Sequence, residues 1–258
     1  MIANELIIFA GGFGSRLSEE TDIIPKPLVE IGGMPIIWHI MKYYSQFGVT
    51  DFTIALGYKG DKIKKYFLKY YYFQNNLSLD LSNNNIKILS DKTENWKINL
   101  IDTGINTLTS KRLKECIKYI NCENFYLTYG DAVSNVDIHK LTKSHLKNNK
   151  ILTMTGVKSP PRFGKLSLNN EGKLLKFNEK KEDKKDLING GFFVVNKKII
   201  DFLKNDEPFE NGPLSSLLKK SQINLYIHEK FWHCMDTLSD KNNLNKIWED
   251  TKIWKNWK

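Results

Sequence analysis

The stretch Leu6–Leu17, which reads LIIFAGGFGSRL, is the part of the chain that decides the fold. Its first half, Leu6–Ala10, is a continuous apolar run that predicts a strand buried on both faces, and it ends abruptly at Gly11 and Gly12. A loop with three glycines in four positions lets a ligand approach the backbone closely, because glycine carries no side chain. Successive N–H groups in such a loop can form a nest for phosphate. The stretch therefore predicts a buried strand that leads into a phosphate-binding loop.

The segments after this loop alternate between helix and strand patterns. Apolar spacing predicts a helix from Pro35 to Phe47, a buried strand over Phe52–Leu56 and a helix over Asp61–Tyr72. Further strands are expected at Phe125–Tyr129, Ile151–Val157 and Gly190–Val195. A helix between two buried strands favours parallel pairing. We therefore expect an α/β protein with a mixed, mainly parallel sheet flanked by helices.

Three other segments complete the expected organisation. Residues 74–95 are polar and rich in asparagine, which predicts an irregular excursion or a hairpin, and Glu179–Asp186 is charged and predicts a loop. The chain after Thr237 predicts a terminal helix with an aromatic face that includes Trp248, Trp254 and Trp257. That face could pack against the core or form a subunit contact. Without a linker or repeat, residues 1–258 are expected to form a single domain.

Composition narrows the functional classes. The chain has 258 residues and a net charge of +10, but its lysines are spread along the sequence instead of forming one stripe, so we expect no nucleic-acid partner. No apolar run near the start approaches the ~20 residues of a membrane span, and we expect no membrane partner. Three cysteines without a C-x-x-C pair predict reduced thiols and a cytoplasmic location.

A lysine between two prolines follows the glycine loop. Pro25-Lys26-Pro27-Leu28 fixes the backbone around Lys26, and Gly11–Leu17 precedes it by about ten residues. Together these segments resemble the sugar-1-phosphate nucleotidyltransferases, whose opening motif is G-G-x-G-[Ser/Thr]-R-L followed by a K-P lysine. Further blocks resemble one branch, the glucose-1-phosphate cytidylyltransferases: Val29–Gly33, Pro35–Met41, Gly57–Gly60, Leu100–Gly104, Arg112–Lys114, Thr128–Asp131, Arg162–Gly164, Ile188–Phe193 and Met235–Leu238.

The resemblance implies a fold and a reaction. The fold would be the Rossmann-like fold of the nucleotide-diphospho-sugar transferases. The reaction would transfer CMP from CTP to a sugar 1-phosphate, most simply glucose 1-phosphate, giving a CDP-sugar and pyrophosphate by in-line displacement. Such a reaction requires that two polyanions be positioned and their charge neutralised. The family it resembles also forms oligomers, so we expect a homo-oligomer, with the aromatic tail as a candidate contact.

The resemblance also assigns roles to residues. Asp131, which stands at the end of a predicted buried strand where α/β sheets place ligands, and Asp236 would hold Mg²⁺. Arg16 and Lys26 would be the catalytic cations that face the phosphates. The remaining nucleotide-binding residues would be Phe9, Ala10, Gly11, Gly12, Phe13, Gly14, Ser15, Thr107, Arg112 and Gly130. The sugar phosphate would be bound by Arg162, Gly164, Glu179, Lys180 and Asn189, with Arg162 alternatively fixing its loop by an ion pair.

The chain departs from the family pattern at several positions, and alternatives stay open. Lys181 stands in place of a proline, Ser110 and Lys111 in place of two glycines, His233 in place of a glutamine, and Ile24 in place of a second lysine. The same chemistry could therefore use another sugar or polyol phosphate, or another NTP. A glycosyltransferase of the same fold should carry an Asp-x-Asp motif, but Tyr129-Gly130-Asp131-Ala132 gives only one carboxylate. An inactive nucleotide-binding subunit should lack one of the motif residues Arg16, Lys26, Asp131 and Asp236, and all four are present.

Overall fold

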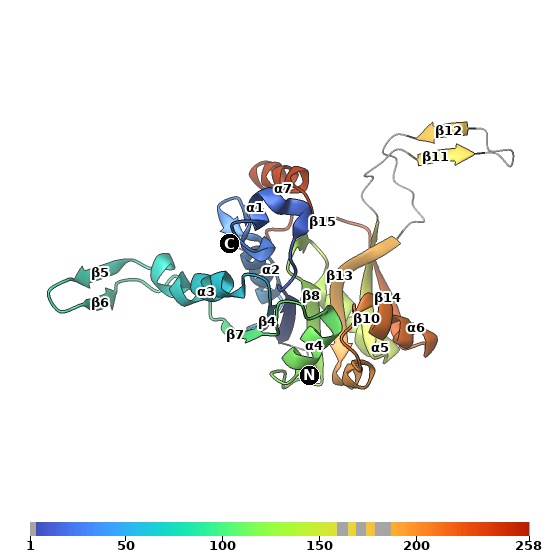
Figure 1. Cartoon of the computed structure of the whole chain (residues 1–258), viewed down its shortest axis with the longest axis horizontal. Helices are drawn as coiled ribbons and strands as arrows, with labels where there is room; N and C mark the ends of the chain where they lie inside the picture. The colour runs from blue at the N-terminus through green and yellow to red at the C-terminus, as the bar shows by residue number, and fades with distance from the viewer. Residues whose placement is uncertain (1–3, 159–164, 169–173, 179–186, 258) are drawn as a thin grey trace.

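A seven-stranded sheet forms the centre of the protein in the computed structural model, which describes residues 4–158, 165–168, 174–178 and 187–257. The strands follow the order β14-β10-β13-β8-β1-β4-β7. Their bounds are β1 Glu5–Phe9, β4 Asp51–Leu56, β7 Lys97–Asp102, β8 Asn124–Tyr129, β10 Leu152–Lys158, β13 Leu187–Asn196 and β14 Ile223–His228. Figure 1 shows the sheet between layers of helices, which confirms the predicted α/β class.

The pairing directions place several strand ends at one edge of the sheet. β1 is parallel to both β4 and β8, β4 is parallel to β7, and β10 is parallel to β14. Only β13 runs antiparallel to its two neighbours within this sheet. The sheet is therefore mixed and mainly parallel, as predicted. Phe9 and Tyr129, the last residues of β1 and β8, lie opposite each other, so the loops that follow these strands meet.

Both faces of the sheet are covered, which explains the continuous apolar run at the start of the chain. Along β1, Leu6 and Ile8 belong to one buried cluster and Ile7 and Phe9 to the other. Helices α2 (Ile36–Ser45), α5 (Ile138–Asn148) and α7 (Leu238–Asp250) contribute to the first cluster. Helices α4 (Thr109–Ile117) and α6 (Ser215–Lys219), with a 3-10 helix over Lys197–Phe202, contribute to the second. When both faces of a strand are buried, apolar residues do not alternate with polar residues along it.

Short elements complete the chain. Two-stranded ladders pair β2 (Glu30–Ile31) with β3 (Met34–Pro35), β9 (Ala132–Ser134) with β15 (Trp232–Cys234), and β11 (Lys165–Leu168) with β12 (Leu174–Asn178). Helix α3 (Gly60–Gln74) leads into a hairpin of β5 (Leu77–Asp80) and β6 (Asn85–Ile88). Of the two structures expected for residues 74–95, the hairpin is therefore the correct one. Figure 1 shows that α3 and this hairpin project away from the sheet.

The C-terminal tryptophans pack inside the body of the protein. Helix α7 begins with a capping box at Thr237 and Asp240 and ends at Asp250, so the prediction of a longer helix is wrong beyond that residue. Trp254 is 1% exposed and stacks on Phe231 at 5.5 Å between ring centroids. Trp248 also lies 4.6 Å from the ring of His39. These contacts confirm the packing interpretation of the aromatic face.

Among the described helices, none combines the length and apolar character that crossing a bilayer requires.

Candidate active site

A cavity of about 260 Å³ lies where the loops after β1 and β8 meet. It is lined by Phe9, Ala10, Gly12, Gly14, Ser15, Arg16, Lys26, Pro27, Thr109, Tyr129, Gly130, Asp131 and Asp236. The two loops are joined directly, since the N–H of Gly130 donates to the carbonyl of Phe9 at 2.9 Å. A Cβ at Gly130 would lie only 2.8 Å from that carbonyl oxygen, so a larger residue would push the two strand ends apart.

The glycine loop is supported from behind by Arg112 of α4. The guanidinium of this buried side chain donates to the carbonyls of Leu56 (2.7 Å), Gly11 (3.1 Å) and Ile105 (3.0 Å) and to the hydroxyl of Thr103 (2.6 Å). Arg112 thus holds the loop to the carboxyl end of β4. The structure does not bring Arg112 into the cavity, and its role as a nucleotide ligand stays a prediction.

Substituting Gly11 with alanine should destabilise the protein. A Cβ there would stand 2.3 Å from Nη1 of Arg112 and 3.0 Å from the backbone nitrogen of Gly57, and the buried guanidinium cannot move without losing hydrogen bonds. We expect Gly11→Ala to cost about 1–3 kcal/mol, the usual range for overpacking, measured by thermal or urea unfolding. Gly12→Ala is the matched control because nothing lies within 4 Å of its Cβ. Equal stability of the two variants would contradict this role of Arg112.

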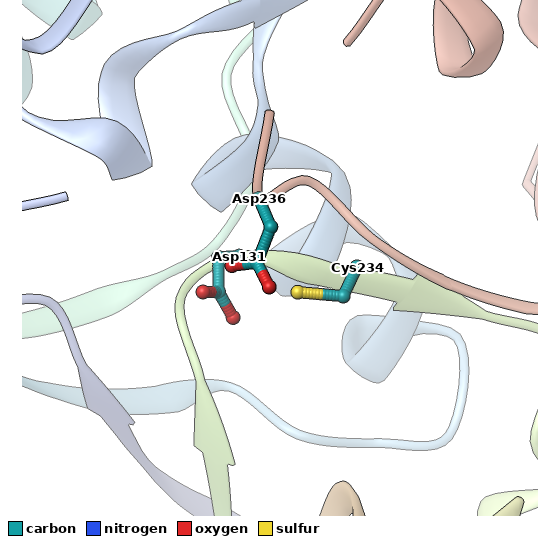
Figure 2. A group of neighbouring side chains, drawn as sticks. All are labelled: Asp131, Cys234 and Asp236. Atoms are coloured by element: carbon teal, nitrogen blue, oxygen red, sulfur yellow. The ribbon is translucent and has the colours of Figure 1, made fainter. Parts of the chain in front are cut away.

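Two carboxylates that lie far apart in the sequence are brought together by the ladder of β9 and β15. Ala132 pairs with Cys234, and the N–H of Met235 donates to the carbonyl of Asp131 at 2.8 Å. The ladder therefore places Asp131 next to Asp236. Figure 2 shows the side chains of Asp131, Cys234 and Asp236 gathered in one group. One potential ligand atom from each lies within 4.8 Å of the others.

Lys26 lies between these two carboxylates. Its Nζ is 2.7 Å from an oxygen of Asp131 and 2.7 Å from an oxygen of Asp236, and the side chain is 12% exposed. Burial alone would lower the pKa of Lys26, but the charge of Asp131 and the hydrogen bonds to both carboxylates raise it well above its ordinary value. Lys26 is therefore a fixed positive charge at the wall of the cavity, held on a 3-10 turn that follows Pro25.

Arg16 is a second cation at the cavity and is held much less firmly. Its Nη1 donates to Asp236 at 2.7 Å, but its side chain is 70% exposed. Because solvent screens an exposed ion pair, this contact restrains Arg16 weakly. The guanidinium is thus free to turn towards an anion that enters the cavity, whereas Lys26 is already in place.

The donor set at this position fits a hard divalent cation. Carboxylate oxygens are the protein ligands that Mg²⁺ prefers, and Asp131 and Asp236 present them towards one another. Lys26 between them indicates that the two carboxylates already stabilise positive charge there. Burial, followed by the charge of Asp131, raises the pKa of the Cys234 thiol well above its ordinary value, so this residue contributes a neutral sulfur. Asp131 and Asp236, and not Cys234, are therefore the side chains that fit a hard divalent cation as ligands.

Most of the predicted nucleotide-binding residues reach the cavity, and some do not. Gly11 and Phe13 do not line it; Phe13 is 51% exposed and packs against Tyr58 at 5.2 Å between centroids. The hydroxyl of Thr107 donates to the carbonyl of Thr103 at 2.5 Å instead of facing the cavity. Of the predicted sugar-phosphate residues, Arg162, Gly164, Glu179 and Lys180 lie outside the described residues.

Three residues that line the cavity were missed from the sequence: Pro27, Thr109 and Tyr129. Tyr129 ends a predicted strand directly before Gly130 and Asp131, and this adjacency could have identified it. Its phenol donates to Glu210 and lies 3.4 Å from the amide nitrogen of Asn189, which joins a predicted sugar-binding residue to the cavity wall.

Both the sequence and the structure of this chain match known proteins. A family described as nucleotidyl transferase matches residues 5–256. The chain is 42% identical to the glucose-1-phosphate cytidylyltransferase of Salmonella typhimurium over 254 residues, covering 97% of this chain and 98% of that protein. A probable glucose-1-phosphate cytidylyltransferase of Bacillus subtilis is also 42% identical, with coverages of 97% and 99%. The crystal structure of HddC from Yersinia pseudotuberculosis superposes with a TM-score of 0.67 at 25% identity, covering 95% of this chain and 99% of that chain. HddC has also been solved in complex with GMP-PN.

Proposed function

This chain belongs to the nucleotidyl transferase family, within the branch of the glucose-1-phosphate cytidylyltransferases, and from that premise we propose that it transfers CMP from CTP to glucose 1-phosphate. The products are CDP-glucose and pyrophosphate. The observation that carries the proposal is Lys26 held between Asp131 and Asp236 at the wall of a glycine-loop cavity. This arrangement supports a reaction between two phosphate-bearing substrates, and identity over nearly the whole chain to enzymes of that name supports the choice of substrates.

The proposed reaction is an in-line displacement at phosphorus. An oxygen of the sugar 1-phosphate forms a new bond to the α-phosphorus of CTP, and the bond between this phosphorus and the bridging oxygen breaks. The electron pair of that bond leaves with pyrophosphate. No covalent help from the protein is required, so catalysis depends on positioning the two substrates and on stabilising negative charge.

The residues divide this work between them. The backbone of the glycine loop binds the triphosphate, since Gly12, Gly14 and Ser15 line the cavity. Lys26 places a fixed positive charge where negative charge develops on the transferred phosphate and the leaving group. Arg16, which is exposed and weakly held, turns from Asp236 to the entering triphosphate and gives it paired hydrogen bonds.

A divalent cation completes the proposed site. Asp131 and Asp236 would hold Mg²⁺, which when bound supplies further neutralisation of the phosphate charge. Both carboxylates share Lys26, so the ammonium and a bound cation would divide the negative charge of the pair between them.

The three cysteines of the chain are free thiols in the described residues, which supports the proposal that the enzyme works in the reducing cytoplasm.

A matrix of substrates tests the proposed function. Pyrophosphate release is measured with each of CTP, UTP, dTTP, GTP and ATP against glucose 1-phosphate and other sugar or polyol phosphates. We expect the pair of CTP and glucose 1-phosphate to give the highest kcat/KM. A higher value for another pair would reassign the substrate within the same chemistry. Absence of release with every pair would contradict the function and favour an inactive nucleotide-binding subunit.

A further inference from the structure

Asp236 lies in a short connection between a strand and a helix. The ladder of β9 with β15 ends at Cys234, and α7 begins at Leu238. This ladder brings Asp236 close to Asp131, but it does not set the direction in which the Asp236 side chain points. That direction depends on the two peptide groups on either side of the Cα atom of Asp236, because their orientation fixes the backbone angles φ and ψ of the residue.

One carboxylate oxygen holds both of these peptide groups. Oδ2 of Asp240 accepts from the N–H of Asp236 at 3.1 Å and from the N–H of Thr237 at 2.9 Å. The same oxygen accepts from the hydroxyl of Thr237 at 2.9 Å, and this hydroxyl accepts from the N–H of Asp240 at 3.2 Å. The side chain of Asp240 is 18% exposed, so solvent competes little for these bonds. Asp240 therefore fixes the backbone of Asp236 from the first turn of α7.

The bond to Asp236 goes beyond what the cap of a helix needs. In a capping box, the side chain at the third helical position accepts from the N–H of the capping residue, which here is Thr237. The N–H of Asp236 belongs to the residue before the cap, outside the set of donors that the start of a helix leaves unpaired. The effect of this additional bond is therefore on Asp236 and not on the helix.

A second contact ties the strand side of the connection to the same helix. Nδ1 of His233 lies 2.9 Å from the carbonyl oxygen of Cys234, and Nε2 lies 3.1 Å from the amide nitrogen of Asn243 on α7. Because a carbonyl oxygen can only accept, Nδ1 carries the proton and Nε2 accepts from the amide. β15 and α7 are thus joined independently of Asp240. Removing the Asp240 carboxylate should free the connection between them without releasing the helix.

The fixed backbone sets the position of both carboxylate oxygens of Asp236. Oδ1 lies 2.7 Å from Nζ of Lys26, and Oδ2 lies 2.7 Å from Nη1 of Arg16. A divalent cation held by Asp131 and Asp236 requires the two carboxylates to keep their relative position. Groups that orient a metal ligand by hydrogen bonds usually change metal affinity about 10–100-fold when they are removed.

We propose that Asp240 is a positioning residue for the metal ligand Asp236. It acts through the two peptide groups that flank Asp236 and is not itself a ligand. This inference rests on the proposed function, because it takes Asp131 and Asp236 as the residues that hold Mg²⁺. It adds to that function a residue of α7 whose contribution is the orientation of the site.

Calorimetric titration of the full chain with Mg²⁺, in the absence of substrates, tests the proposal. We expect Asp240→Ala to raise the Kd for Mg²⁺ at least about tenfold. Asp240→Asn keeps an oxygen that accepts from both N–H groups and removes the charge, so its Kd should stay close to that of the wild type. Equal losses in the two variants would show that Asp240 acts through its charge, and this would overturn the positioning role.

Thr237→Ala is the matched control for the stability of α7. It removes the hydroxyl that caps the helix and leaves the carboxylate that accepts from Asp236. Its midpoint of thermal unfolding should fall at least as far as that of Asp240→Ala, whereas its Kd for Mg²⁺ should stay near the wild-type value. A loss of Mg²⁺ affinity as large as that of Asp240→Ala would assign the effect to helix stability and overturn the proposal.

Hydrogen exchange measures the orientation of the connection without metal or substrate. The amide of Asp236, followed by NMR, should exchange at least about tenfold faster in Asp240→Ala than in the wild type. If Asp240→Ala fails to fold, Asp240→Ser takes its place with the same expected results, because the shorter side chain does not reach the N–H of Asp236. Unchanged exchange and unchanged Mg²⁺ affinity in the variant would overturn this inference alone. A wild-type chain that binds no Mg²⁺ would overturn the proposed metal site and this inference with it.

Discussion

Replacing Lys26 with alanine should lower kcat/KM for CMP transfer by at least about a hundredfold. Lys26 is held at 2.7 Å from both Asp131 and Asp236. Burial alone would favour its neutral form, but the charge of Asp131 and the hydrogen bonds to both carboxylates outweigh burial and keep it a cation at the cavity. Loss of one preorganised group that stabilises charge in the transition state typically costs this much. Steady-state pyrophosphate release with saturating and limiting CTP would separate the effect on kcat from the effect on KM.

The control for this variant is a lysine in a similar ion pair away from the cavity. Lys42 bonds Glu94 at 2.6 Å, and its side chain is 21% exposed, close to the 12% of Lys26. Lys42→Ala should therefore disturb stability comparably and leave kcat/KM near the wild-type value. If Lys26→Ala retained activity within a few-fold of wild type, or if both variants lost activity equally, the assigned role of Lys26 would be wrong.

Asp131→Asn and Asp236→Asn should each slow the reaction at least about a hundredfold and raise the concentration of divalent metal required for half-maximal activity. Asparagine keeps the size of the side chain and removes its charge, so the site loses both a hard metal ligand and a partner of Lys26. The measurement is the initial rate of pyrophosphate release as a function of Mg²⁺ concentration. Each variant should also bind Mg²⁺ more weakly in a titration without substrates.

Asp137→Asn is the control for these two variants. Asp137 caps α5 by accepting a hydrogen bond from the N–H of Lys140, and asparagine caps a helix equally well. Its rate and metal dependence should match the wild type. An Asp131→Asn or Asp236→Asn variant with wild-type metal dependence would remove that residue from the proposed metal site.

The parts of the fold that local pattern determines could be predicted from the sequence. The run Leu6–Ala10 is apolar throughout because β1 is buried on both faces, and this run predicted a buried strand. The extent of the C-terminal helix could not be predicted in the same way. Trp254 and Trp257 continue the apolar pattern, but they pack around His39 after α7 has ended at Asp250, and this packing depends on residues more than 200 positions earlier.

Site residues that follow the end of a strand could be predicted from the sequence. Site residues that are positioned by contacts between distant segments could not. Gly11–Leu17 and Asp131 directly follow β1 and β8, so the position of the cavity followed from the strands. The family resemblance alone suggested that Asp131 meets Asp236. This meeting depends on the ladder of β9 with β15, which was not predicted. The side chain of Arg112 could not be placed, because α4 directs it against carbonyls from three separate segments.

The most direct test of the central claim is to identify the product formed from a mixture. Purified protein is incubated with Mg²⁺, glucose 1-phosphate and equal concentrations of CTP, UTP, dTTP, GTP and ATP, and the nucleotide sugars are separated and identified by mass spectrometry. We expect CDP-glucose as the main product, formed in an amount equal to the pyrophosphate released. A different nucleotide sugar as the main product, or pyrophosphate released without any nucleotide sugar, would contradict the account.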